Sequence, residues 1–464
     1  MRRPFRWIAR HLLVGAMFVA ACSSDRRTEL PAQDTGPQTS APPPYEDGFQ
    51  PSSQYWDASA ADAAEGGSTF LTGPVRVFAF GWTSCALVPG NVLKCWGRNA
   101  YGLVGNGDVE ERDVLEPSVV SGIAPTMVAG GREHVCASDG TQVWCWGRNE
   151  YGALGHRGDT DAGDSTCKDG KRCNLSPTPI TGLTGVRQIA SGTDFSCALM
   201  NDRTVRCWGR NDLAQLGILP DGGSFASCNG VPCSEEPVVV PGLSNIDQIA
   251  LGDAAGCART VLGDVECWGR LYDVVYEGGN GVLRHYYSPP RTPTTLPEVQ
   301  ATTDIALGKD HACVVYGTSA VGCMGTNRWR QSLGDTFGSD VIETISPRPP
   351  SMSPYGFRRL ALGELHACGL TNDNVVYCWG GSTNGQILGW GCLNPALSAI
   401  ELSTLFGATD VSAGVQHTCV ARANGEVHCF GLNDHGQIGG EIVQPRACTD
   451  TSYSGVYRQI TGLL

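Results

Sequence analysis

Cysteines are the residues of this sequence whose spacing most clearly suggests chemistry. Seven times, two cysteines stand nine or ten residues apart, and a bulky residue and then a glycine follow the second cysteine. The seven pairs are Cys85 with Cys95, Cys136 with Cys145, Cys197 with Cys207, Cys257 with Cys267, Cys313 with Cys323, Cys368 with Cys378, and Cys419 with Cys429. Paired cysteines can form disulfides or bind a metal ion, so the residues around them have to decide between the two.

The stretch between the two cysteines favours disulfides. Between Cys85 and Cys95, two short apolar runs flank Pro89-Gly90-Asn91, which is typical of a β-hairpin turn. Opposed residues at a non-hydrogen-bonded site of an antiparallel pair have Cα atoms about 4.5 Å apart, which permits a disulfide. Each bond closes a loop of about ten residues and would stabilise the fold by roughly 2–3 kcal/mol. We therefore predict one cross-strand disulfide per hairpin.

A metal site is the alternative for these cysteines. Four pairs have a histidine two places before the first cysteine, namely His134, His311, His366 and His417. The other three pairs have Thr83, Phe195 and Ala255 there, and a single hairpin rarely supplies four convergent zinc ligands. We expect no metal and no cofactor.

Seven of the 21 cysteines lie outside the repeated pairs. Cys167 with Cys173, and Cys228 with Cys233, are close enough to close small loops within two insertions, and Cys392 and Cys448 lie at matching places in successive repeats. We predict a disulfide for each of these three pairs, the last one cross-linking two neighbouring repeats. The seventh cysteine is Cys22. So many cysteines in an exported chain indicate an oxidising compartment.

The elements that position the pairs recur at intervals of 51 to 61 residues, a period typical of propellers and other repeat arrays. The third copy has four β-like runs, over residues 179–182, 186–190, 195–199 and 204–208. This pattern predicts an all-β ring of four-stranded blades. Residues 457–463 repeat the Ile-Thr-Gly-Leu of 180–183 and would add a strand beside the first unit, unless residues 70–73 supply it locally.

Three further features recur with the cysteines. A glycine stands five residues before the first cysteine in six copies, which suggests close backbone approach or a positive φ near a central channel. The tryptophans after the second cysteine could stack on a ligand, but their fixed place in every strand favours blade packing. An x-Gln-Leu-Gly-like element follows in most copies and is missing from the fourth.

Taken together, Cys-Ala-Leu, Val-x-Cys-Trp-Gly-x-Asn and x-Gln-Leu-Gly resemble the regulator of chromosome condensation repeat. The resemblance covers about residues 70–464 and implies a seven-bladed β-propeller. The paired hairpin cysteines depart from the eukaryotic members and look like an exported bacterial branch of that family.

The amino terminus predicts export. Residues 1–21 have four arginines, no acidic residue and an apolar run from Leu12 to Ala21 that is short for a membrane span. Val19-Ala20-Ala21-Cys22 resembles the lipobox of bacterial lipoproteins, which implies lipid attachment at Cys22; the alternative is an ordinary secretory signal with a chance cysteine. Ser23 after the cysteine favours the outer membrane or cell surface within the cell envelope. Residues 22–69, rich in Ser, Ala and Pro, would form a disordered linker.

The net negative charge of the chain argues against one class of partner, nucleic acid. Without the four arginines of the leader, 29 basic residues face 46 acidic ones, a net charge of −17 with neutral histidines. Such a surface repels phosphate backbones, so we expect no nucleic acid partner. The sequence contains no nucleophile elbow, zinc-protease helix motif or phosphate-binding loop, which removes the positive argument for an enzyme.

The favoured hypothesis is a membrane-tethered, extracytoplasmic scaffold that binds a protein or glycan through loops on one face. The candidate contact segments are the insertions, because connecting segments vary where blades cannot: residues 156–176, 218–236, 271–292, 390–397 and 440–455. Tyr272, Tyr276, Tyr286 and Tyr287 are candidate anchors, although they could equally cover a blade edge. The alternatives are a lyase or glycan-processing enzyme with carboxylates at the channel mouth, and nucleotide exchange on a small GTPase, which export and acidity oppose.

Overall fold

The computed structural model describes residues 73–157, 164–221, 225–277, 283–287, 289, 291–297, 299–317, 320–332, 341–342, 356–387, 396–442 and 456–463, with the backbone alone for 273–277, 283–287, 341–342, 396–398 and 456. In this part of the chain, no helix has the length and hydropathy needed to span a membrane. The predicted leader, Cys22, the linker and the pair of Cys392 with Cys448 lie outside the described residues.

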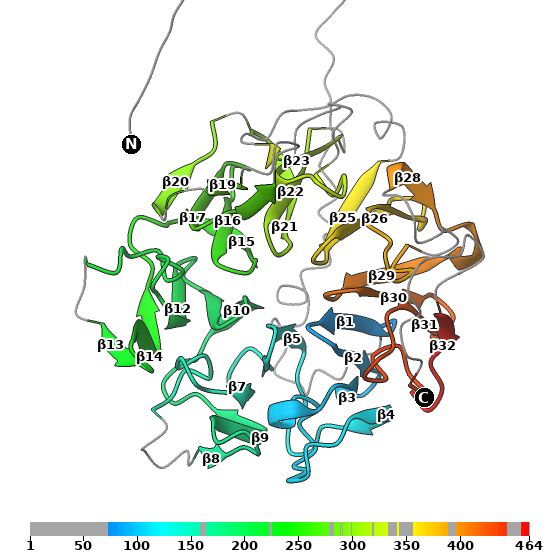
Figure 1. The fold of residues 1–464 in the computed structure, drawn as a ribbon, viewed down its shortest axis with the longest axis horizontal. Coiled ribbons are helices and arrows are strands. Elements are labelled where there is room, and N and C mark those ends of the chain that lie inside the picture. The colour runs from blue at the N-terminus through cyan, green and yellow to red at the C-terminus, as the bar shows by residue number, and fades with distance from the viewer. Residues whose placement is uncertain are drawn as a thin grey trace, which may run out of the picture. The chain divides into compact units, whose positions relative to one another are not determined.

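Seven antiparallel sheets of four or five strands stand around a common axis (Figure 1), so the prediction of an all-β, seven-bladed propeller is confirmed. In each blade the first three strands follow one another from the centre outwards, and the fourth strand returns along the outside. The first blade is β1 (Arg76–Phe80), β2 (Thr83–Val88), β3 (Val92–Gly97) and β4 (Val114–Val119). A short 3₁₀ turn, η1 (Ala100–Gly102), precedes β4, and another, η3 (Ser403–Leu405), follows the sixth blade.

The other blades repeat this plan with local additions. The second is β5 (Met127–Gly130), β6 (His134–Ser138), β7 (Val143–Arg148) and β9 (Arg172–Pro179) with β8 (Ser165–Thr166) at its edge; the third is β10 (Val186–Ser191), β11 (Phe195–Met200), β12 (Val205–Arg210) and β14 (Val231–Val239) with β13 (Ala226–Cys228). The fourth is β15 (Ile246–Leu251), β16 (Ala255–Thr260), β17 (Val265–Gly269) and β20 (Arg291–Thr295); the fifth is β21 (Thr302–Leu307), β22 (His311–Tyr316), β23 (Ala320–Thr326) and β24 (Val341–Ile342). The sixth is β25 (Phe357–Leu362), β26 (His366–Thr371), β27 (Val376–Gly380) and β28 (Ala396–Glu401); the seventh is β29 (Ala408–Ala413), β30 (His417–Arg422), β31 (Val427–Gly431) and β32 (Val456–Gln459).

The unit of the fold starts one strand later than the predicted repeat. We expected residues 179–182 to open the third unit, but β9 ends at Pro179 and pairs with β7 of the second blade, Trp144 facing Pro179. A period fixes the length of a repeat but not its starting point, and the fourth strand belongs to the hairpin that precedes it.

The same offset corrects the closure of the ring. The carboxyl-terminal strand β32 pairs with β31 of the seventh blade, not with the first blade, which is built locally from residues 76–119. Beyond β32, Ile460 and Leu463 pack with Val75 and Val77 in the core between the last and first blades. Lys94 Nζ donates to the Gly462 and Leu463 carbonyls at 2.7 and 2.8 Å. Among the described residues, the ring is therefore closed by noncovalent contacts, which combine this side-chain packing with hydrogen bonds between the seventh and first blades.

The hairpin cysteines face each other across the second and third strands of every blade, in the pairs that their spacing predicts. In blade order, Cys85 faces Cys95, Cys136 faces Cys145, Cys197 faces Cys207, Cys257 faces Cys267, Cys313 faces Cys323, Cys368 faces Cys378, and Cys419 faces Cys429. Their Cα atoms lie 4.0–4.2 Å apart and their sulfurs lie at bonding distance. Each hairpin can therefore carry its disulfide without a change in register.

Two further cysteine pairs lie in the insertions. Cys167 and Cys173 are joined with a Cα separation of 5.9 Å, and Cys228 and Cys233 with a Cα separation of 5.7 Å. All nine bonds of the described residues lie within one blade, so none of them links one blade to the next.

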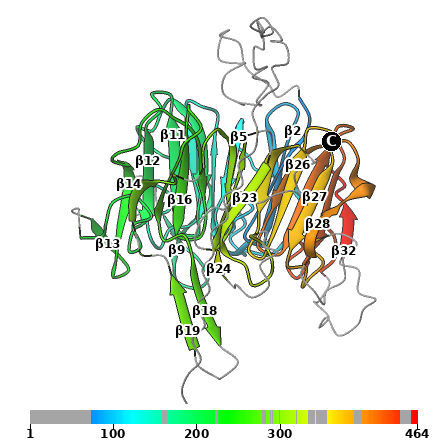
Figure 2. The ribbon, with the colours of Figure 1, turned by 90° about the horizontal axis from the view of Figure 1, so that it is seen from above.

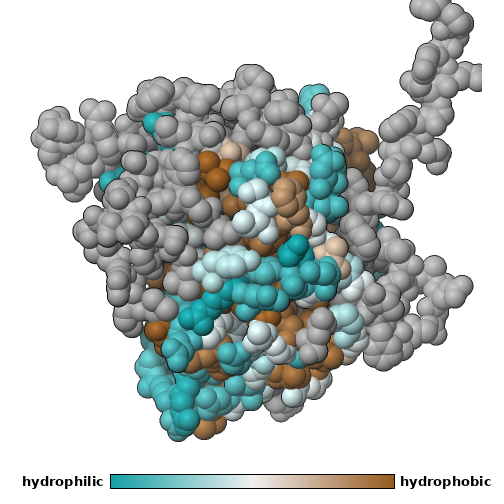
Figure 3. Space-filling view, turned by 90° about the vertical axis from the view of Figure 1, so that its right-hand side faces the viewer, coloured by the Kyte–Doolittle hydropathy of each residue, from teal (hydrophilic) through white to brown (hydrophobic). Residues whose placement is uncertain are grey.

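Strand order defines two faces. Because neighbouring strands are antiparallel, the connections between strands one and two and between strands three and four leave at the same end of every blade. We call this end the loop face, and the end with the connections between strands two and three the turn face. Hairpin β18 (Asp273–Glu277) and β19 (Leu283–Tyr287) arises between strands three and four of the fourth blade and extends from the loop face (Figure 2). On the rim beside β28 and β32, hydrophilic and hydrophobic residues are interspersed (Figure 3).

Glycines crowd the axis of the ring. A Cβ added to Gly252 would lie 2.4 Å from the carbonyl oxygen of Gly308, and one added to Gly308 would lie 2.4 Å from that of Gly363. No real Cβ makes such a contact with backbone, so close approach between successive first strands, and not a positive φ, requires these glycines.

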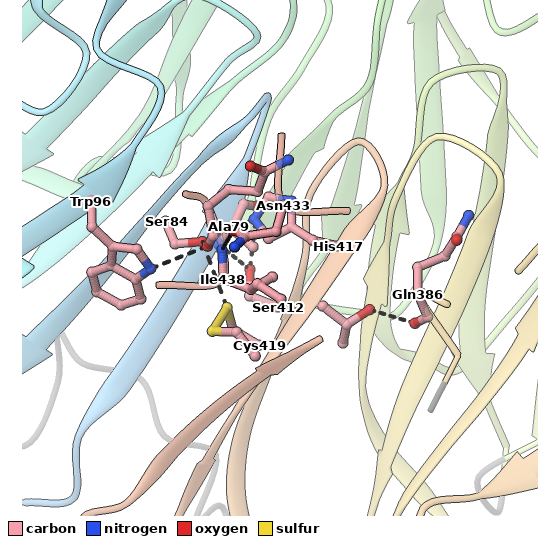
Figure 4. Close-up of a disulfide and its surroundings, with 12 residues drawn as sticks. Ala79, Ser84, Trp96, Gln386, Ser412, His417, Cys419, Asn433 and Ile438 are labelled. Atoms are coloured by element: carbon pink, nitrogen blue, oxygen red, sulfur yellow. Dashed lines mark hydrogen bonds between the residues drawn. A yellow bond between two sulfur atoms is a disulfide. The ribbon is translucent and has the colours of Figure 1, made fainter. Parts of the chain in front are cut away.

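Buried polar contacts join one blade to the next. The histidine two places before a cysteine bonds to a hydroxyl of the following blade: His134 Nε2 lies 2.7 Å from Ser196 Oγ, His366 Nε2 lies 2.8 Å from Thr418 Oγ1, and His417 Nε2 lies 2.9 Å from Ser84 Oγ. Figure 4 shows the last of these joints, beside Cys419. Ser84 Oγ donates its own proton to the Gln437 carbonyl at 2.8 Å, so it accepts from His417, whose ring is neutral with the proton on Nε2.

His311 is the exception among these histidines. It is buried, 2% exposed, and neither ring nitrogen has a hydrogen-bond partner among the described residues. The next blade has Ala367 where the equivalent positions have Ser196, Thr418 and Ser84. The joint between the fifth and sixth blades therefore lacks the hydroxyl that the other three histidines use.

Restoring that hydroxyl should strengthen the ring. We expect Ala367→Ser to raise the free energy of unfolding by about 1 kcal/mol, because it supplies an acceptor for the unpaired His311 N–H. The matched control is Ala312→Ser, at the same place in the fifth blade, where the preceding blade has Ala255 and no histidine can bond to the new hydroxyl. Thermal unfolding of both variants checks this; equal effects of the two substitutions would contradict the assignment.

The buried histidines should also make the ring sensitive to acid. Burial lowers the pKa of His134 to about 4 and those of His311, His366 and His417 to about 3, from an ordinary value of 6.5. Because protonation then favours the unfolded chain, stability is complete above pH 6.5 and falls as the pH drops towards 4, by up to about 1.4 kcal/mol per histidine and pH unit. Unfolding temperatures measured between pH 7.5 and 5 check this, a window above the titration of ordinary carboxylates. His311→Gln should reduce the slope by about a quarter, since it removes one of four such groups. A flat profile would show that these histidines do not titrate on unfolding.

Candidate functional site

The connections that contain the five predicted contact segments all leave their blades on the loop face. Residues 156–176, 218–236, 271–292, 390–397 and 440–455 belong to the connections between the third and fourth strands of the second, third, fourth, sixth and seventh blades, and the first four ranges extend into the fourth strand. Residues 158–163, 222–224, 278–282, 288, 290, 388–395 and 443–455 within these ranges lie outside the described part. Insertions from five blades thus share one side of the ring, which period and composition alone did not show.

The four candidate tyrosines lie at the fourth-blade hairpin. Tyr276 belongs to β18, and Tyr286 and Tyr287 belong to β19, where the backbones of Val274 and Tyr286 face each other. Tyr272 stands at the base of the hairpin and packs, half-buried, against the core between the fourth and fifth blades. The structure therefore gives Tyr272 a packing role at the foot of the hairpin.

A small cavity marks the centre of the loop face. It has a volume of about 130 Å³ and is lined by the connections between the first and second strands of all seven blades. Two of its charged residues pair across neighbouring blades, with Lys309 Nζ 2.6 Å from Glu364 Oε1. Asp253 accepts a hydrogen bond from Thr193 Oγ1. Each of these two acids has its own donor, so they are not arranged as a pair of carboxylates that could share acid–base chemistry.

Trp82 lies beside this cavity, in the connection between β1 and β2. The guanidinium groups of Arg98 and Arg132 lie over its ring, 5.0 and 4.9 Å from the centroid, within the range of cation–π contacts. His435 of the seventh blade meets the same indole edge-on at 6.4 Å and contacts Asp113 Oδ2 at 2.8 Å through Nδ1. The loop-face edge of the first blade thus brings together half-buried side chains from three blades.

Backbone geometry holds Trp82 and Arg98 together. Gly97, which follows the buried Trp96, has φ +106, and a Cβ there would lie 2.7 Å from the Trp82 carbonyl oxygen. This glycine lets β3 bulge, so that the Arg98 N–H donates to the same carbonyl at 3.0 Å. Gly97 therefore positions Arg98, the residue that follows it.

The contacts continue across the second and third blades. Glu133 lies 3.6 Å from Arg98 and also pairs with Arg148, whose guanidinium lies over Tyr101 and Tyr151 at 5.4 and 5.9 Å. Arg210 covers Tyr151 from the next blade at 5.0 Å. We call the set Trp82, Arg98, Tyr101, Arg132, Glu133, Arg148, Tyr151 and Arg210 the arginine–aromatic ladder.

Burial shifts the pKa values of two acidic groups in or beside the ladder, Asp194 and Tyr101. Burial raises the pKa of Asp194, although Arg210, at 3.4 Å, opposes the shift. Burial, together with a hydrogen bond of 2.8 Å to Asp169, raises the pKa of Tyr101 to about 12. Tyr101 is therefore a neutral hydrogen-bond donor at physiological pH, and the ladder carries its charge on arginines and carboxylates.

Sequence reasoning did not find the ladder, although it left a signal. Arginine occurs two places after the tryptophan in the first four repeats, at Arg98, Arg148, Arg210 and Arg270. Three of these residues stack on aromatic side chains. Except for Tyr151 beside Arg148, those partners come from other connections or from neighbouring blades, so the repeat alone could not identify them.

The tryptophans of the repeat serve packing, as predicted. Trp96, Trp146, Trp208, Trp268 and Trp379 are all fully buried. Each donates through Nε1 to a carbonyl in the loop of the preceding blade, for example Trp146 to Leu103 at 2.9 Å and Trp208 to Ala153 at 2.9 Å. They fix the base of the loop face and are not available to a ligand.

Comparisons with known proteins agree with this architecture. A profile of the regulator of chromosome condensation (RCC1) repeat matches residues 93–138 and 141–199, and a second profile of that repeat matches residues 186–215, 357–386 and 408–437. The ultraviolet-B receptor UVR8 of Arabidopsis thaliana is 28% identical over 371 residues, which are 78% of this chain and 77% of the receptor. The secretion-regulating guanine nucleotide exchange factor of Bos taurus is 26% identical over 379 residues, 75% of each chain.

Solved structures show the same fold at low sequence identity. Yeast RCC1 (Prp20), in a crystal structure with Kap60, superposes with a TM-score of 0.62 at 18% identity, covering 82% of this chain and 85% of the yeast protein. Human WBSCR16 superposes with a TM-score of 0.62 at 20% identity, covering 75% and 91%. Blade count, matched repeats and these superpositions agree: the described residues fold as a seven-bladed β-propeller, and the segments named above are similar to the regulator of chromosome condensation repeat.

Proposed function

We propose that the protein is an extracytoplasmic scaffold, tethered to a membrane by a lipid on Cys22, that binds a protein partner through its loop face. The observation that carries the proposal is the clustering of the insertions of five blades on one side of the ring. A rigid scaffold that varies only in loops at one end is the usual arrangement of a recognition surface.

The position of the first strand supports the tether. β1 begins at Arg76 on the turn face, since the connections between strands two and three lie at that end of the blade. The described chain therefore enters the first blade at the end opposite the loop face, so a tether that precedes it need not cover the loops.

The cysteine chemistry supports export. Nine cysteine pairs of the described residues lie at disulfide distance, and bonds of this kind persist in oxidising compartments. The hairpin bonds are buried, so they would act as structural staples and not as redox groups.

Relatives favour protein binding over catalysis. The yeast propeller was solved in complex with Kap60, and two relatives are named as a receptor and as an exchange factor. In this chain, Asp253 and Glu364 at the central cavity are each engaged by their own donor. The loop face also carries the arginine–aromatic ladder, and aromatic residues and arginine are enriched at interface hot spots.

Capture of a partner tests the proposal. Full-length protein with a carboxyl-terminal tag is compared with a variant whose hairpin, residues 273–287, is replaced by a three-residue turn, and with Leu262→Ala, an 81% exposed residue on the turn face of the same blade. We expect wild type and Leu262→Ala to retain one defined protein that the hairpin variant retains at least about tenfold less, with Tyr276→Ala, Tyr286→Ala and Tyr287→Ala intermediate. Equal capture by all variants, or turnover of a glycan panel without capture, would refute it.

The tether has its own test. In cells fed an alkyne-bearing fatty acid, wild type should carry the label and sediment with membranes, whereas Cys22→Ala should lose both, because the lipid supplies the hydrophobic anchor. Cys392→Ala, which leaves Cys22 in place, is the control for loss of a cysteine. Unlabelled wild-type protein in the soluble fraction would argue for an ordinary secretory signal.

A further inference from the structure

The two arginines that lie over Trp82, Arg98 and Arg132, have one carboxylate contact between them, from Glu133 to Arg98. Arg98, Arg132 and Arg148 face two carboxylates, Glu133 and Glu150, and Arg148 pairs with both of them. Among the described residues, no carboxylate lies within 4.0 Å of the Arg132 guanidinium, which has the Trp82 ring as its neighbour. Two further acids near this edge, Asp113 and Asp434, lie 2.8 and 4.0 Å from the ring nitrogens of His435 and do not contact the two arginines.

This pair of arginines contrasts with the net negative charge of the chain. The chain has a formal net charge of −13, or −17 without its leader, yet the first-blade edge of the loop face presents two guanidinium groups on one half-buried indole. The two groups are pre-positioned, Arg98 by the Gly97 bulge and both by the ring of Trp82. A site of this kind is built for an anionic group beside an apolar surface.

Resting on the function proposed above, we propose that Trp82, Arg98 and Arg132 form a subsite for an aspartate or glutamate side chain of the protein partner. One carboxylate can accept hydrogen bonds from both guanidinium groups, while the residues around it contact the indole. A guanidinium is weakly hydrated and less costly to bury in an interface than an ammonium, which suits arginine to this role.

The surroundings favour a protein carboxylate over a nucleic acid. Glu133, Glu150, Asp194 and Asp212 all lie along the ladder, within 4.0 Å of its arginines. An extended polyanion laid across the ladder would meet these carboxylates and the acidic surface beyond them. A single acidic side chain at Trp82 avoids them.

Quenching of Trp82 fluorescence tests the local charge without a partner. The Trp82 signal is taken as the difference between wild type and Trp82→Phe, and iodide and caesium are compared at constant ionic strength. We expect iodide to quench this signal at least about threefold more strongly than caesium, because the two guanidinium groups attract the anion. The ratio is expressed relative to that of N-acetyltryptophanamide, because iodide quenches a free indole more efficiently than caesium does. The double variant Arg98→Gln/Arg132→Gln should bring this relative ratio close to one, whereas Arg203→Gln, an arginine at a turn-face connection, should leave it unchanged. A relative ratio close to one in wild type overturns the proposal.

Peptide selection tests the chemistry of the ligand. Random twelve-residue peptides displayed on phage are selected on the full-length protein and on the Arg98→Gln/Arg132→Gln variant. We expect enrichment of aspartate and glutamate on wild type and a loss of at least about tenfold in binding of those peptides to the variant. Selected peptides without acidic residues, or acidic peptides that bind both proteins equally, overturn the subsite. A phosphate-bearing oligonucleotide that competes for the same arginines would instead assign the site to nucleic acid and overturn the proposal.

Failure of the subsite and failure of the scaffold function give different results. If the hairpin-dependent partner is captured equally by wild type and by the Arg98→Gln/Arg132→Gln variant, the subsite is wrong and the loop-face function stands. If no variant captures a partner while iodide still quenches Trp82 selectively, the scaffold function is wrong and the anion preference is a property of the ring alone.

Discussion

The contact between successive blades is the constraint on which the rest of the structure depends. Each disulfide of the described residues lies within one blade, so the ring is held by packing and by buried polar bonds between neighbours. In the joint between the last and first blades, the Gln437 carbonyl accepts from both Ser84 Oγ, at 2.8 Å, and Trp96 Nε1, at 3.1 Å, while His417 donates to Ser84. A buried polar group without a hydrogen bond destabilises the folded state. Here the buried donors of the first blade find their acceptor on the backbone of the seventh blade.

That dependence also shapes the loop face. Carbonyls that accept from a tryptophan belong to the connection between strands three and four of the preceding blade, such as Gln215 for Trp268 and Gln331 for Trp379. The start of each such connection is thus fixed by the core of the next blade, and only the part beyond it is free to lengthen. The same contact therefore explains why the start of a connection is rigid and why the part beyond it can vary in length. The arginines of the arginine–aromatic ladder that follow a buried tryptophan lie at the rigid start.

Much of the fold was predictable because its signals are local. The hairpin cysteines, the turn between them and the glycine after the tryptophan act within about fifteen residues, and the repeat multiplies them seven times. The starting point of the blade was not predictable, because β9 and β32 pair with strands that precede them by a long connection. The histidine joints were missed because their partners lie a whole repeat away: His134 finds its hydroxyl 62 residues later, and Ser84 meets His417 across 333 residues. The ladder was missed because its local contacts are joined into one set by contacts between neighbouring blades, such as Arg132 over Trp82 and Arg210 over Tyr151.

The sequence does record these joints once the pairing is known. Where a repeat lacks the histidine, as at Thr83, Phe195 and Ala255, the next repeat has Val135, Gly256 and Ala312 in place of serine or threonine. The fourth repeat lacks the Gln-Leu-Gly element, and the fifth has Met324 in place of the tryptophan that would donate to it. In the seventh repeat Phe430 replaces the tryptophan while the sixth repeat keeps its element, and the Gln386 carbonyl accepts from Thr418 Oγ1 at 3.0 Å instead. In the other cases named here donor and acceptor are lost together, because either one alone would leave a buried polar group unsatisfied. His311 beside Ala367 breaks this rule, and it does so next to the fourth and fifth blades, whose joint already lacks both contacts. The joints on both sides of the fifth blade therefore lack the histidine–hydroxyl bond, and another buried group takes over there. Asp304 of the fifth blade accepts from Gln248 Nε2 of the fourth blade at 2.6 Å and from the Leu360 N–H of the sixth blade at 2.7 Å, so one carboxylate links three successive blades.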